Sequence, residues 1–157
     1  MTTIETSAGE AVRATLKARH RREIGELDYR RGVIVLDQQG LSQTRIAQLL
    51  GVKQPTIHRV IERAKSVPMP RDGFSGADPF EICERYAADV IDRSQLVDEL
   101  TRWNYAPRGT LATELDDLIV DPVGSFGDVE RALRQGLIDD DVFDEVADRI
   151  EAQTAVA

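Results

Sequence analysis

The stretch that decides the fold is LSQTRIAQLLGVKQPTIHRVI, residues 41–61. Ser42 is a residue type favoured at helix N-caps, and Gly51 tolerates the backbone conformation of a tight turn. Proline is well accommodated in a first helical turn, so a second helix is expected to begin near Gln54 and Pro55. The stretch therefore predicts two short helices joined by a turn.

Apolar side chains at helical spacing define the faces that these two helices bury. The residues expected to face inward are Ile46, Leu49, Leu50, Ile57, Val60 and Ile61. Ala47 matters because two helices that cross steeply need a small side chain at their closest approach. The outward face of the second helix is left to Gln54, Thr56, His58, Arg59 and Arg63.

This arrangement resembles the helix-turn-helix of bacterial DNA-binding regulators over roughly residues 30–65. The motif's small, turn and buried positions are filled by Ala47, Gly51, Val52, Ile57 and Val60, and the run GVKQPTIHRVI is similar to the recognition element G-V-S-Q-P-T-V-S-R. Lys53 departs from the pattern, because serine commonly caps the recognition helix at this position. Losing that cap costs about 1 kcal/mol, and a cation at a helix N-terminus is favourable only if DNA supplies an anion.

The resemblance implies a recognition helix in the major groove of double-stranded DNA. Arg59 suits guanine and Gln54 suits adenine, because each can make a two-pronged contact with the base edge. The base-contact candidates are Gln54, Thr56, His58 and Arg59, and the phosphate-contact candidates are Ser42, Arg45, Lys53 and Arg63. The alternative is a helical hairpin whose polar face is only solvated.

The preceding residues also have a helical pattern of apolar side chains. One long helix, or two helices broken near Gly25 or Gly32, is expected over residues 9–38, with Gly40 ending it. The basic run KARHRRE, residues 17–23, is compatible with contact to the DNA backbone or with the solvated face of a long helix.

The net charge of −8 is divided unevenly along the chain. Residues 1–70 carry 12 Lys or Arg and 7 Asp or Glu, giving +5, whereas residues 71–157 carry 8 and 21, giving −13. Seven of the eight aromatic residues also follow residue 70. A basic first half and an acidic second half predict two separate cores, with the first half facing phosphates.

The predicted fold is all-α, with an N-terminal helix-turn-helix domain over residues 1–66, a Pro/Gly linker over 67–79 and an acidic domain of helical hairpins over 80–157. The segment SVPMPRDGFSGADP, residues 66–79, contains three prolines and two glycines, which interrupt helix and strand alike. Trp103 and Tyr105 fit the core of the second domain or the anchor of a partner interface.

A weak internal repeat relates residues 79–103 to residues 125–150 at an offset of 46 to 47. In both copies an Ile-Asp pair follows the first helix. Ile91 and Ile138 are expected to close the open ends of the hairpins, and Asp92 and Asp139 to cap the helices that follow.

No motif indicates catalysis, a cofactor or a metal site. The carboxylates Asp139, Asp140, Asp141, Asp116 and Asp117 are read as capping or solvated groups, since they lack the spacing of a calcium loop. Cys83 is expected to be a small core residue. No stretch has the length of a membrane span or the pattern of a signal peptide, so a cytoplasmic, nucleoid-associated protein is expected.

Three functions fit these patterns. The first is a transcriptional regulator, expected to be a repressor or autoregulator and a homodimer that dimerises through its acidic half. The second is an antitoxin that binds a toxin through that half and represses its own operon. The third is an adaptor that binds only proteins.

Overall fold

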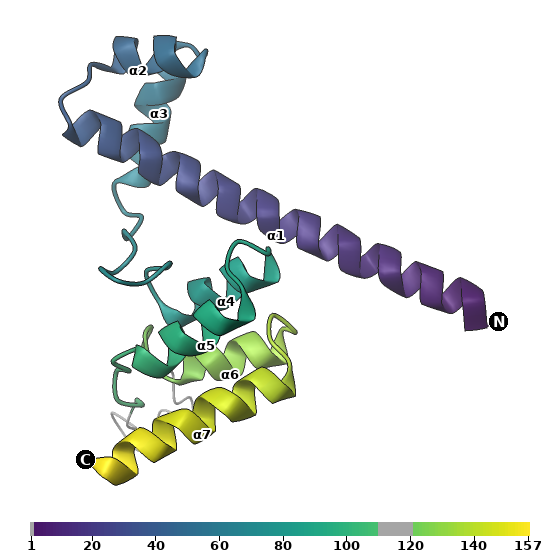
Figure 1. The fold of residues 1–157 in the computed structure, drawn as a ribbon. Coiled ribbons are helices and arrows are strands. Elements are labelled where there is room, and N and C mark those ends of the chain that lie inside the picture. The colour runs from purple at the N-terminus through teal and green to yellow at the C-terminus, as the bar shows by residue number, and fades with distance from the viewer. Residues whose placement is uncertain (1, 110–120) are drawn as a thin grey trace, which may run out of the picture. The chain divides into compact units, whose positions relative to one another are not determined.

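The computed structural model describes residues 2–109 and 121–157, and within these ranges it is all-α, as predicted, with seven helices and no β-strand (Figure 1). Asp116 and Asp117 lie outside the described residues. The chain forms two compact units. The smaller unit comprises residues 22–69, and the larger unit comprises residues 1–21 together with residues 70–157.

These units divide the chain at positions different from the predicted 1–66, 67–79 and 80–157. Hydrogen bonds explain why the end of the Pro/Gly segment groups with the larger unit. The backbone N–H and the hydroxyl of Ser75 donate to Glu99 Oε2 at 2.9 and 2.8 Å, and the Ala77 N–H donates to Glu81 Oε2 at 2.9 Å. Two buried carboxylates therefore hold a segment that composition alone marks as a linker.

The smaller unit is built from the C-terminal part of α1 (Thr2–Gln38), with α2 (Gln43–Leu50) and α3 (Gln54–Ala64). Gly25 and Gly32 do not break α1. The helix ends before Gly40, whose φ of +88° is easily adopted by glycine, and the Leu41 N–H donates to the Leu36 carbonyl oxygen at 3.2 Å. The predicted end of the long helix is thus confirmed.

Five buried side chains form the core of the smaller unit: Val33, Ile46, Ala47, Ile57 and Ile61. The prediction was wrong for Leu49 and Leu50, which are 55% and 41% exposed. Ala47 takes the second inward position in α2, and Leu50 instead lies on an apolar groove along α1 that no other described part of this unit covers.

The larger unit consists of two helical hairpins, α4 (Pro79–Ala87) with α5 (Arg93–Arg102), and α6 (Gly127–Arg134) with α7 (Asp140–Val156). Helix α4 packs against α6, and α5 packs against α7 (Figure 1). Cys83 is fully buried, and Trp103 is 4% exposed, so the core reading of both residues is confirmed.

Backbone hydrogen bonds show that the two hairpins repeat the same turn at a constant offset of 47. In the first copy the Ala88 and Val90 N–H groups donate to the carbonyl oxygens of Glu84 and Arg85, at 2.9 Å each. In the second copy the Gln135 and Leu137 N–H groups donate to the carbonyl oxygens of Arg131 and Ala132, at 3.0 Å each.

The Ile-Asp pairs also occupy the predicted places. Asp92 Oδ1 accepts the Gln95 N–H at 2.8 Å, and Asp139 Oδ1 accepts the Val142 N–H at 2.9 Å, so both caps are confirmed. Ile91 and Ile138 are buried in the common core.

Candidate nucleic-acid interface

The turn between α2 and α3 is fixed by its backbone. Gly51 has a φ of +69°, in the left-handed region that glycine adopts without the steric cost of a Cβ. Its neighbour Val52 donates its N–H to the Ala47 carbonyl oxygen at 3.0 Å, which ends α2 and redirects the chain. A substitution at Gly51 would strain this turn and displace α3.

Helix α3 begins without a side-chain cap. Lys53 is the N-cap residue, with φ −82° and ψ 146°, and its side chain makes no capping hydrogen bond. The first turn also contains Pro55. Since the first N–H groups of a helix have no partners within the helix, the start of α3 presents partial positive charge together with the Lys53 ammonium group.

The predicted base-contact residues lie on the first two turns of α3. Gln54, His58 and Arg59 are exposed, and Thr56 is half-buried. The Gln54 amide donates to Gln43 Oε1 at 2.7 Å, which links the starts of α2 and α3. Arg59 Nε is 3.4 Å from the Pro55 carbonyl oxygen, a long contact that leaves the guanidinium available for other acceptors.

The four predicted phosphate-contact residues, Ser42, Arg45, Lys53 and Arg63, are all exposed. Ser42 caps α2, because its Oγ accepts the Arg45 N–H at 3.2 Å. A hydroxyl that accepts one hydrogen bond still has a hydrogen to donate. Capping and phosphate contact are therefore compatible at Ser42.

The α2–α3 segment is strongly basic. Residues 42–65 contain five Lys or Arg and a single acidic residue, Glu62. Lys65 Nζ lies 2.6 Å from Glu62 Oε1, and its hydrogen bond lowers the pKa of the Glu62 carboxyl. The one carboxylate on this segment is thus partly neutralised by its neighbour.

Sequence reasoning missed two arginines of α1. Arg31 is 5% exposed and donates to the Pro68 carbonyl oxygen from Nε at 3.0 Å and from Nη2 at 2.6 Å, which ties α1 to the segment after α3. Arg30 lies one residue before it and lines a recess between α1 and α3. A helical pattern of apolar residues cannot tell that one arginine is buried and the next lines a recess, because adjacent residues of a helix point in different directions.

The basic run 17–23 has contacts that its composition did not indicate. Lys17 Nζ lies 2.8 Å from Asp89 Oδ2, and Arg21 Nε donates to the Ala88 carbonyl oxygen at 3.0 Å. Part of the run therefore holds the start of α1 on the turn between α4 and α5.

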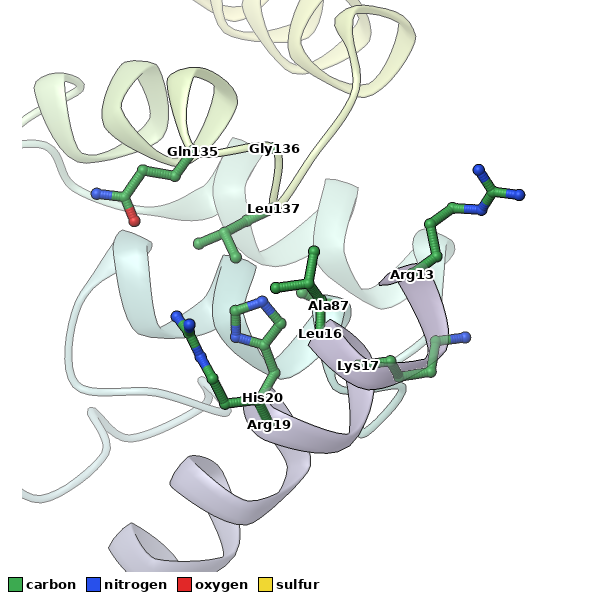
Figure 2. Close-up of a pocket in the computed structure, with 9 residues that line it drawn as sticks. All are labelled: Arg13, Leu16, Lys17, Arg19, His20, Ala87, Gln135, Gly136 and Leu137. Carbon is green, nitrogen blue, oxygen red and sulfur yellow. The ribbon is translucent and has the colours of Figure 1, made fainter. Parts of the chain in front are cut away.

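A pocket of about 260 Å³ lies beside these contacts in the larger unit. Figure 2 shows the His20 ring and the Arg19 guanidinium pointing towards the side where Gln135 and Leu137 lie, whereas the Arg13 guanidinium and the Lys17 ammonium extend away from it. Of these three cations one faces the pocket, so they do not converge there, and the α2–α3 segment is the stronger candidate for an anionic ligand.

Comparisons of the chain with protein-family models, with curated proteins and with solved structures found no match. In residues 2–109 and 121–157, no group of three or more His, Cys, Asp or Glu side chains is placed to hold a metal ion. No helix in the same ranges is long and apolar enough to cross a membrane.

Proposed function

We propose that the protein is a sequence-specific DNA-binding transcription regulator, and not an enzyme, and that α3 enters the major groove. The observation that carries the proposal is the α2–turn–α3 unit itself. Ala47, Ile57 and Ile61 are buried between the helices, the turn is closed at Gly51, and the exposed side of α3 presents Gln54, His58 and Arg59.

The side chains of this surface suit two kinds of DNA contact, one to bases and one to phosphates. The polar side chains on the first turns of α3 have the donors and acceptors needed to read base edges, while Arg45, Lys53 and Arg63 carry charge suited to phosphates. In a homodimer, two copies of α3 would lie about 34 Å apart on a two-fold operator.

The first experiment is a fluorescence anisotropy titration of the full chain with DNA from its own promoter and with an unrelated duplex, at about 50 and 200 mM salt. We expect tighter binding to the promoter at both salt concentrations and a steep loss of affinity with salt, because phosphate contacts release counterions. Equal affinity for both duplexes would contradict sequence-specific regulation, and no binding to either would overturn the proposal.

Arg59→Ala tests the docking of α3. We expect it to weaken promoter binding by about 1 to 3 kcal/mol and to relax the preference at one base pair, measured by titration against single-base-pair variants of the site. Lys53→Ala is the comparison, and it should weaken all duplexes alike. An unchanged base preference in Arg59→Ala would mean that another face of the unit contacts the bases.

A further inference from the structure

A recess between α1 and α3 of the smaller unit is lined mainly by arginines. It has a volume of about 160 Å³, and its lining residues are Glu26, Arg30, Thr56, Arg59, Val60 and Arg63. Three guanidinium groups and one carboxylate thus border a space on the flank of α3, and two of its lining residues, Thr56 and Arg59, are also proposed to contact bases.

We propose that this recess binds a phosphate of the DNA backbone and that Arg30 is a phosphate-contact residue. The inference rests on the proposed function, and it extends the DNA-binding surface from α2 and α3 to α1. Arginine suits this role because its planar fork of N–H donors matches the oxygens of a phosphate.

The position of Arg30 is already set in the free protein. Its Nε lies 3.0 Å from Glu26 Oε1, one helical turn earlier, and its side chain is 36% exposed. Glu26 is 56% exposed, so the pair is in contact with solvent. Because Glu26 also lines the recess, this contact keeps the arginine at the recess in the free protein. A solvent-exposed ion pair is weak, so it can yield to a phosphate when DNA binds.

Charge in the recess favours an anion. The three arginines outnumber the single carboxylate, and the two arginines of α3, Arg59 and Arg63, are exposed. Without an added anion these like charges repel one another across the recess. A backbone phosphate would relieve that repulsion and would fix the rotation of α3 in the groove, since phosphate contacts set the register of a protein on DNA.

The test compares three single substitutions in the full chain. Arg30→Gln removes the proposed contact, Glu26→Gln removes the carboxylate beside it, and Arg13→Gln is the matched control. Arg13 is an exposed residue of the same helix, lies outside the basic run 17–23 and does not line the recess. Glutamine favours helices about as much as arginine and glutamate do, so the helix should be unaffected, and thermal unfolding checks that the fold is kept.

We expect Arg30→Gln to lower the affinity roughly five- to tenfold for the promoter and the unrelated duplex alike, and to reduce the slope of log K against log salt by about 1. Glu26→Gln should tighten binding to both duplexes, and Arg13→Gln should leave the slope within error of the wild type.

The inference is overturned if Arg30→Gln changes affinity and slope no more than Arg13→Gln does, or if it weakens only the promoter, which would indicate a base contact. Either result can occur while the wild type still binds its promoter and Arg59→Ala still relaxes base preference. Failure of the proposed function would instead appear as a wild type that binds no duplex.

Discussion

Lys53 is the residue at which the proposed DNA binding and the stability of the fold make opposite demands. At the N-cap of α3 it contributes no capping hydrogen bond, whereas a serine there would accept one from the first turn. We expect Lys53→Ser to raise the free energy of unfolding by about 1 kcal/mol relative to Lys53→Ala, measured by urea denaturation. Both variants should weaken binding to all duplexes equally, because both lose the cation.

Two results for Lys53→Ser and Lys53→Ala would contradict these expectations, one in stability and one in DNA binding. Equal stability of the serine and alanine variants would show that the start of α3 cannot accept a side-chain cap. A serine variant that binds DNA as tightly as the wild type would remove Lys53 from the phosphate-contact residues.

For single residues, the features that depend only on local chemistry were predicted correctly from the sequence. The cap at Ser42, the turn at Gly51 and the burial of Ile57 follow from residue type and spacing. Leu50 was wrongly predicted to be buried. Helical spacing shows on which face of a helix a side chain lies, but tertiary packing decides whether another element covers that face. Arg30 was missed for the same reason, since its neighbours in the recess come from a helix more than twenty residues away.

At the scale of elements, the two hairpin turns differ at one position. Gly136 has a φ of +73°, and the equivalent residue in the first hairpin is Asp89, with a φ of +57°. Aspartate tolerates this region better than most residues but less well than glycine. The ion pairs of Asp89 with Lys17 and Arg21 suggest why a carboxylate is present there instead.

These ion pairs predict a pH dependence. The hydrogen bond from Lys17 lowers the pKa of the Asp89 carboxyl. The stabilisation is therefore present above the ordinary carboxyl pKa and is lost as the pH falls through the lowered value of the folded protein. We expect Asp89→Asn to unfold at lower urea concentration than the wild type at neutral pH, and the difference to shrink in acid.

Asp148→Asn, at an exposed position of α7, is the control for this measurement. A difference between Asp89→Asn and the wild type that stays constant with pH would show that the ion pairs do not contribute. The effect should be modest, since both partners are about half exposed.

For the whole molecule, the distribution of buried residues predicts how the chain can be divided. The core of the larger unit draws its buried residues from positions between Ile82 and Val146, and none of the α1 residues whose burial is described, from position 7 onward, belongs to it. We expect residues 70–157 expressed alone to unfold cooperatively, as followed by circular dichroism, and not to bind DNA. A fragment that lacks a cooperative transition would show that the start of α1 is needed for folding.

Composition predicted two cores but could not predict how α1 is shared between the units. The change in charge and aromatic content lies near residue 70, and the second core does begin there. Residues 1–21 join the larger unit through polar contacts such as those of Lys17 and Arg21, and such contacts between distant positions leave no periodic signal in the sequence.

The burial of Cys83 makes its thiol a reporter of local opening. It is the single cysteine of the chain, it is fully buried, and burial raises the pKa of its thiol. A thiol reacts as the thiolate and only where reagent reaches it, so alkylation must wait until α4 opens. The rate at which Cys83 is alkylated in the native protein therefore reports how often the larger unit opens, and no cysteine has to be introduced for this measurement.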